Sequence, residues 1–160
     1  MGITIRNLFF FYFILVLGWL FFNGFLQAEG FLQFCAMSFL EHLLAAFLLI
    51  TFLCAFLQHQ TKRARIVYST VALIWSVLGA IISMHHVWMQ YFLRGAIVAE
   101  LPDGMTFVQI IKMGIVGDQS CRVIGFSIHG MSLEIIATLF FLVFAAISFV
   151  HLKNALTYKQ

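Results

Sequence analysis

Four stretches of the chain contain no Asp, Glu, Lys or Arg, and each is long enough to cross a lipid bilayer. They cover residues 7–28, 42–61, 66–93 and 135–152. A helix needs about 20 apolar residues to cross the hydrocarbon core, and charged side chains there are costly. An apolar span is expected to be helical because a helix satisfies its backbone hydrogen bonds internally. The sequence therefore predicts four membrane crossings.

The composition agrees with a chain embedded in a membrane. Hydrophobic residues make up 63% of the 160 residues and charged residues 9%, with a mean hydropathy of +1.04. A soluble domain has about 25% charged residues. No repeat or low-complexity segment marks a second unit, so we expect one domain over residues 1–160. The predicted fold is an all-α, four-helix transmembrane bundle with helices over about 8–25, 39–57, 66–88 and 131–152.

The basic residues predict the side of the membrane on which each segment lies. Six of the nine lie at the amino terminus, at residues 62–65 and in the carboxyl-terminal tail, three segments that share one side of a four-crossing chain. The other three, Arg94, Lys112 and Arg122, all lie in the longer second loop on the other side. The positive-inside rule puts this side, with both termini, in the cytoplasm. Loops over about 26–38 and 90–130 then lie on the outer side. The net charge of +3 reflects this topology, and no binding to nucleic acid is expected.

The second outer loop is long enough to hold structure of its own. Asp103, in a Pro-Asp-Gly turn, is expected to cap a helix that follows. Within residues 105–116, the apolar side chains that share one helix face are Phe107, Val108, Ile111 and Ile115. This pattern is typical of a short amphipathic helix that lies on the membrane surface.

Side chains with useful chemistry gather at the outer ends of the expected helices, where ionisable residues suggest function. They are Cys35, Glu41, His42, His85, His86, Cys121 and His129. Cys35 and Cys121 lie in different outer loops, and an oxidising compartment permits a disulfide between them. Spacing alone leaves open a redox-active disulfide, a structural one, or two unpaired thiols. Cys54, deep among Leu and Phe, is expected to be a small apolar side chain without chemistry.

Three stretches on the outer side have the order and spacing of one known family. Residues 34–42 correspond to a first-loop signature of approximately P-C-x-x-C-x-x-x-R, with Glu or Gln before the Arg. Gly79 and His86 match the end of the third helix, and residues 112–132 match the stretch around a last essential cysteine. Over nearly its whole length, the chain resembles the disulfide bond formation protein B (DsbB) family of bacterial inner-membrane proteins.

The resemblance implies a function. Family members oxidise a periplasmic thioredoxin-like thiol oxidase (DsbA-like) and pass the electrons to a quinone, here ubiquinone or menaquinone. By analogy, Cys35 and Cys121 are the catalytic cysteines, while Glu41, His42 and His86 bind the quinone. No metal ligand is assigned. The protein is then a multi-pass oxidoreductase of the inner membrane, surrounded by lipid, with its active face toward the periplasm.

The chain departs from the family pattern at several of these positions. Ser38 stands in place of the second cysteine of C-x-x-C, Phe34 in place of the proline, and His42 in place of an arginine that helps hold the quinone. No cysteine lies between Cys54 and Cys121, so the loop cysteine that exchanges with the partner is missing. A serine cannot do the redox chemistry of a thiol. The family's usual relay of two cysteine pairs is therefore not available.

We consider two interpretations within the family. In the first, Cys35 and Cys121 form a single disulfide that is reoxidised by a quinone near His42 and His86. A helix amino terminus or a protonated His42 would stabilise the Cys35 thiolate. In the second, the protein is a non-catalytic relative that binds a quinone or a partner protein. The changes at Ser38 and His42 favour it, because histidine does not replace an always-charged, forked arginine.

A third interpretation comes from a different class of protein. It is a membrane bundle in which two of four histidines bind a haem or a metal ion. The four are His42, His85, His86 and His129. Against it, no ligand spacing recurs, and the adjacent His85 and His86 point to different faces of a helix.

Overall fold

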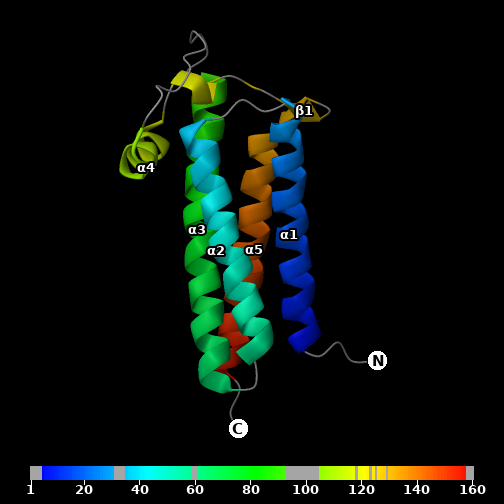
Figure 1. Cartoon of the computed structure of the whole chain (residues 1–160). Helices are drawn as coiled ribbons and strands as arrows, with labels where there is room; N and C mark the ends of the chain where they lie inside the picture. The colour runs from blue at the N-terminus through cyan, green and yellow to red at the C-terminus, as the bar shows by residue number, and fades with distance from the viewer. Residues whose placement is uncertain are drawn as a thin grey trace.

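Four long helices dominate the computed structural model, which describes residues 5–30, 35–58, 61–92, 105–117, 119–122, 124, 126–128 and 130–157. They are α1 (Ile5–Ala28), α2 (Ala36–Gln58), α3 (Lys62–Phe92) and α5 (Leu133–Thr157). They stand side by side as an elongated bundle (Figure 1). The short elements between α3 and α5 are α4 (Phe107–Val116), the 3-10 helix η1 (Gln119–Arg122), β1 (Ser127–Ile128) and β2 (Met131–Ser132). These short elements gather at one end of the bundle (Figure 1).

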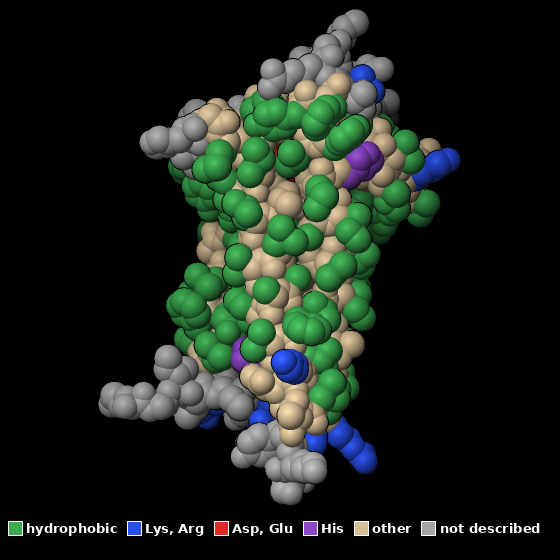
Figure 2. Space-filling view, turned by 180° about the vertical axis from the view of Figure 1, so that it is seen from behind, with side chains coloured by type: hydrophobic (Ala, Val, Ile, Leu, Met, Phe, Trp, Pro, Cys, Tyr) green, Lys and Arg blue, Asp and Glu red, His purple; other side chains and the backbone are tan. Residues whose placement is uncertain are grey.

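Each of the four long helices is long and apolar enough to cross a membrane. Figure 2 shows hydrophobic side chains over the middle of the molecule, with Lys and Arg side chains toward its two ends. The predicted four-helix transmembrane bundle is confirmed, and the protein is a multi-pass membrane protein. The beginning of α1 and the end of α5 lie at the same end of the bundle (Figure 1), as an even number of crossings requires.

Three of the four long helices, α1, α2 and α3, extend beyond their predicted bounds at both ends. α2 begins at Ala36 rather than near residue 39, and α3 covers Lys62–Phe92 rather than 66–88. Backbone hydrogen bonding continues into polar flanking residues, so helix bounds predicted from hydropathy underestimate helix length. α5 instead starts later than predicted, at Leu133, because the two preceding residues form β2 and pair antiparallel with β1.

The helices pack as successive neighbours around a core of apolar side chains. α3 makes its most extensive contact with α5, α2 packs against α3, and α1 packs against α2. Where α3 meets α5, a Cβ added at Gly79 would overlap the ring of Phe141, which is fully buried. Small residues allow this kind of close helix approach inside a membrane. Closer to the end of the bundle where α1 begins and α5 ends, aromatic rings of α1, α2 and α5 contact one another, among them Tyr12, Phe52 and Phe144.

The helix α4 runs across the bundle axis beside the start of α2; it is seen end-on in Figure 1. Thr106 is its N-cap residue, and the Gln109 side chain accepts a hydrogen bond of 2.8 Å from the Thr106 backbone N–H. The expected cap, Asp103, lies outside the described residues. The exposed apolar residues of α4 are Phe107, Val108, Ile115 and Val116. A helix at a membrane surface presents such side chains to lipid.

Candidate redox site

A disulfide joins Cys35, directly before α2, to Cys121 in η1. Their Cα atoms lie 5.3 Å apart, although 86 positions separate the two residues in the sequence. Both side chains are buried, with exposed fractions of 3% and 1%, in a cluster with Met37 and Met89. The sequence left the pairing of these cysteines open. The structure places them in one disulfide at the end of the bundle that carries α4.

The first turn of α2 contacts the sulfur of Cys35. The backbone N–H of Ser38 donates a hydrogen bond to Sγ of Cys35 at 3.4 Å. Cys35 thus acts like an N-cap residue, whose side chain accepts from a free N–H group at the start of a helix. The helix dipole also favours negative charge at this end. This environment stabilises a Cys35 thiolate when the disulfide is opened.

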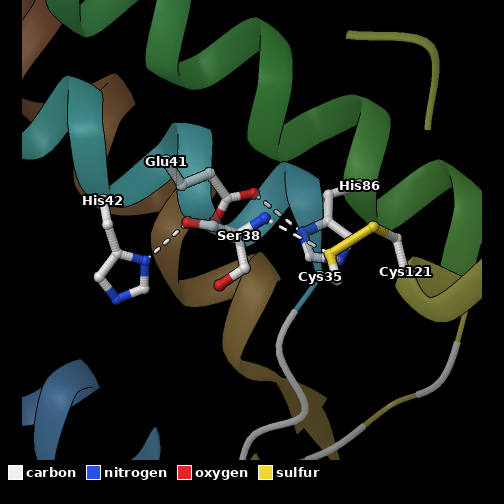
Figure 3. Close-up of a disulfide and its surroundings, with 6 residues drawn as sticks. All are labelled: Cys35, Ser38, Glu41, His42, His86 and Cys121. Atoms are coloured by element: carbon white, nitrogen blue, oxygen red, sulfur yellow. Dashed lines mark hydrogen bonds and ion pairs between the residues drawn. A yellow bond between two sulfur atoms is a disulfide. The ribbon is translucent and has the colours of Figure 1, made fainter. Parts of the chain in front are cut away.

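His86 on α3 lies between the disulfide and a carboxylate (Figure 3). Its Nε2 lies 3.5 Å from Sγ of Cys35, and its Nδ1 lies 3.0 Å from Oε1 of Glu41 on α2. Both residues are buried, with exposed fractions of 2% for His86 and 8% for Glu41. An Nδ1–H that donates to Glu41 fixes the ring and directs Nε2 toward the sulfur. Four groups from three elements therefore meet in one buried site.

The direction of the His86 side chain follows from the phase of α3. Gly79, Ser83, His86 and Gln90 recur at steps of three and four residues, which places them on one helix face. All four are buried, and Ser83 satisfies its hydroxyl by donating to the Gly79 carbonyl at 2.8 Å. This face points into the bundle. His85 is one position out of phase and is partly exposed.

His42 lies apart from the disulfide, on the far side of Ser38 in Figure 3. Its Nδ1–H donates to the Ser38 carbonyl at 2.6 Å, and its Nε2 is buried without a hydrogen-bond partner among the described residues. His42 follows Cys35 by seven residues, so the rise of the helix places it about 10 Å farther along α2. The structure therefore brings Cys35, Cys121, Glu41 and His86 together and leaves His42 beyond them.

Glu134, in the first turn of α5, is a buried acidic residue that the sequence analysis did not assign to the site. Its exposed fraction is 8%, and its Oε2 is buried without a hydrogen-bond partner among the described residues. It lies within electrostatic range of His86. The sequence signal for Glu134 was its position as an acidic residue at the outer end of the last apolar stretch. The burial of its side chain depends on how α5 packs against α3, which the sequence alone does not show.

The remaining sequence candidates do not form a second centre in the described part of the chain. Cys54 is a free, half-buried thiol in the far half of α2. His129, one of the histidines considered for a haem or metal site, lies outside the described residues. Among the residues described, the one group of three or more side chains placed to share a metal ion is Cys35, His86 and Cys121. A site built from the histidines alone gains no support from this arrangement.

The geometry of the site suits thiol–disulfide exchange coupled to proton transfer. A thiolate that attacks Sγ of Cys121 releases Cys35 as a thiolate. That leaving group lies beside the Ser38 N–H and the His86 ring. Nε2 of His86 is close enough to give or take the proton of the Cys35 thiol, and Glu41 holds the ring in place for this role.

Comparison with known proteins adds one finding. The family model described as disulfide bond formation protein DsbB matches residues 5–151. This range contains both cysteines of the disulfide, Glu41 and His86. No curated protein and no solved structure matches the chain.

Proposed function

Because the chain belongs to the disulfide bond formation protein B (DsbB) family, we propose that it oxidises protein thiols through Cys35–Cys121 and passes the electrons to a membrane quinone. The observation that supports this function best is the contact between the disulfide and His86, with Nε2 3.5 Å from Sγ of Cys35. A disulfide that serves only as a staple needs no titratable group against its sulfur. Here the histidine also has its own carboxylate partner, Glu41.

The oxidative half of the reaction balances with one disulfide. A thiolate of the partner protein attacks Sγ of Cys121, and Cys35 leaves as a thiolate. The second partner thiolate then attacks the partner sulfur of the mixed disulfide and releases Cys121. The partner gains a disulfide, while Cys35 and Cys121 take up two electrons and two protons. Cys35 is the better leaving group in the first step because the backbone N–H of Ser38 donates a hydrogen bond to its sulfur.

Re-forming the disulfide removes these two electrons and two protons. A bound quinone supplies the two-electron acceptor that this half-reaction needs. Within the protein, His86 takes the proton of the Cys35 thiol through Nε2, and Glu41 stabilises the ring orientation that makes this transfer possible. Cys121 then bonds again to Cys35. We assign His86 and Glu41 to proton handling rather than to direct contact with the quinone.

His42 fits the headgroup of a quinone. Its Nε2 is a buried polar atom without a partner among the described residues, and its Nδ1–H is engaged by the Ser38 carbonyl. A neutral imidazole held in this way offers Nε2 as an acceptor for a quinol hydroxyl. A protonated one offers an N–H for a quinone carbonyl. His42 is therefore the residue that we expect to hold the headgroup, whether of a ubiquinone or of a menaquinone.

We place the site on the periplasmic side of a bacterial inner membrane, where its partner is a thioredoxin-like, DsbA-type thiol oxidase. Support comes from the distribution of charge. The basic cluster at residues 62–65 forms the first turn of α3, at the opposite end of the bundle from the disulfide. The positive-inside rule assigns that end to the cytoplasm.

The test is quinone reduction by purified protein in lipid nanodiscs, with a reduced DsbA-type protein as the thiol donor and a short-chain ubiquinone or menaquinone as acceptor. We expect the wild type and the matched control Cys54→Ala to bleach the quinone absorbance. Cys35→Ala and Cys121→Ala are expected to lose this activity. Unimpaired turnover in Cys35→Ala would refute the assignment.

Ser38 favours a second candidate function, that of a relative which binds a quinone or a partner without turnover. With serine at position 38, the chain lacks the cysteine that would form a redox-active pair with Cys35. The same assay separates the two functions. A wild type that reduces no quinone, yet gains thermal stability when the quinone is added, is a binding protein.

A further inference from the structure

We propose that the reduced protein binds one Zn²⁺ ion through Cys35, Cys121 and His86. The three potential ligand atoms, two Sγ and one imidazole nitrogen, all lie within 4.8 Å of one another, and all three side chains are buried. The three ligands come from the start of α2, from η1 and from α3, so no short sequence motif marks this site. This property is separate from quinone turnover and depends only on the placement of the two thiols and the imidazole.

The geometry needs only a small adjustment to hold the ion. Zn–S and Zn–N bonds of about 2.3 and 2.0 Å place neighbouring ligand atoms of a tetrahedral site about 3.5 to 3.8 Å apart. Reduction breaks the S–S bond, and the two sulfurs separate toward this spacing. A Cα separation of 5.3 Å leaves the side chains free to do so. With three protein ligands, the fourth position is open to water.

The surroundings of the cluster match those of zinc ligands. A metal-bound histidine donates its second ring N–H to a carboxylate, which fixes the tautomer and the ring orientation. Glu41 accepts from Nδ1 of His86 at 3.0 Å, which leaves Nε2, on the sulfur side, to bind the metal. A second buried carboxylate, Glu134, lies within electrostatic range of His86 and has an unpartnered Oε2 among the described residues. Two thiolates, one imidazole and nearby acidic groups favour a borderline-soft divalent cation.

Metal binding and disulfide formation exclude each other at this site. Two electrons from a dithiol or a phosphine convert Cys35–Cys121 into two thiols. The ion then replaces both thiol protons, and two protons are released for each Zn²⁺ bound. The bound ion occupies the sulfurs, so it protects the reduced form from oxidation. Zinc would thus hold the redox site in its reduced, inactive state.

The experiment uses full-length Cys54→Ala protein in detergent, stripped of metal, reduced anaerobically with a phosphine and titrated with Co²⁺ as a visible probe for Zn²⁺. We expect one equivalent to give a thiolate-to-cobalt charge-transfer band and tetrahedral d–d bands, both removed by Zn²⁺. The unreduced protein should give neither band. Cys121→Ala and His86→Ala should each lose at least tenfold in affinity, and Glu41→Gln should lose about 10-fold while keeping the sulfur band.

Three results would overturn the site. They are no charge-transfer band in the reduced protein, equal Co²⁺ binding before and after reduction, or an unchanged affinity and spectrum in His86→Ala. If His86→Ala does not fold, two other measurements decide the matter. They are the Co²⁺ affinity of Glu41→Gln, and whether Zn²⁺ protects the thiols of Cys35 and Cys121 from an alkylating reagent. None of these readouts requires a quinone. A failed quinone assay therefore leaves the metal result intact, and a failed titration leaves the quinone assay intact.

Discussion

The carboxylate of Glu41 lies 3.0 Å from Nδ1 of His86, a contact that joins α2 to α3 immediately beside the disulfide. Both side chains are buried, in a chain of which only 9% of the residues are charged. Burial of such groups is costly unless they are paired. The pair therefore orients His86 toward Cys35 and also satisfies two polar groups that would be unpaired without each other.

Removing the Glu41 carboxylate should destabilise the protein according to how much of the contact survives. In Glu41→Ala, the buried Nδ1–H loses its acceptor, so we expect the free energy of unfolding to fall by about 1 to 3 kcal/mol. In Glu41→Gln, the amide oxygen still accepts from Nδ1–H, and the loss should be clearly smaller. Thermal unfolding followed by tryptophan fluorescence measures both. Equal losses would show that the negative charge, and not the hydrogen bond, is what stabilises His86.

The disulfide should contribute to stability as well as to chemistry. It closes a segment of 86 residues. In the chain-entropy model, such a loop is worth about 4.6 kcal/mol, and less where the helices stay inserted in the unfolded state. We expect Cys121→Ser to lower the melting temperature by several degrees, while Cys54→Ser changes it little. An unchanged melting temperature in Cys121→Ser would mean that the bond does not constrain the unfolded chain.

The packing of α3 against α5 predicts that Gly79 cannot be enlarged. A Cβ at this position would overlap the ring of Phe141, which is fully buried. Overpacking of this kind costs about 1 to 3 kcal/mol, so Gly79→Ala should unfold at a lower temperature. Gly18→Ala is the control, because its added Cβ meets no atom of another described helix within 4 Å and alanine favours a helix. A Gly79→Ala protein as stable as this control would contradict the packing.

Restoring the family's second cysteine should redirect the disulfide. The backbone N–H of Ser38 is already 3.4 Å from Sγ of Cys35, so a thiol introduced at position 38 competes with Cys121 for this sulfur. We expect Ser38→Cys to contain a mixture of two disulfides, Cys35–Cys121 and a bond from Cys35 to the introduced thiol, with Cys121 free in the second form. Peptide mapping by mass spectrometry under non-reducing conditions identifies each pair, with Ser38→Ala as the control. Exclusive retention of Cys35–Cys121 would show that η1 holds its cysteine too tightly for exchange.

The four membrane helices were predictable because hydrophobic length is a property of the sequence read in one dimension. The family was also recognisable, because Gly79, His86 and Cys121 keep their order and spacing. The match to residues 5–151 confirms the recognition. The catalytic roles of the cysteines and the quinone roles of the polar residues stay predictions.

The internal arrangement of the site was not predictable in the same way. The family resemblance implied that Glu41, His42 and His86 bind a quinone, but it did not show how these side chains are directed, and neighbours on a helix point about 100° apart. Glu41 faces His86, whereas His42 turns to the Ser38 carbonyl of its own helix. The burial of Glu134 likewise depends on how α5 packs, which hydropathy does not report.

The position of α4 gives a final prediction, which concerns access to the disulfide. Gly114 is the buried residue of α4, and a Cβ there would lie 2.6 Å from Cδ1 of Leu40 and 2.7 Å from the Ala36 carbonyl oxygen. At the end of the same helix, a Cβ at Gly117 would lie 2.9 Å from Cε of Met89. Met89 is one of the two methionines that bury the disulfide. α4 therefore packs against the side chains that cover the Cys35–Cys121 disulfide, and Met89 is one of them.

Gly114→Val should push α4 away from α2 and loosen this cover. We expect a phosphine to reduce the Cys35–Cys121 disulfide faster, by about tenfold for each 1.4 kcal/mol by which the closed arrangement is weakened, because reduction requires local opening. The rate is measured by quenching with a mass-adding maleimide in a Cys54→Ala background. Ile115→Val, at an exposed position of the same helix, is the matched control. Equal rates in the two variants would mean that the disulfide is reached by a route that does not involve α4.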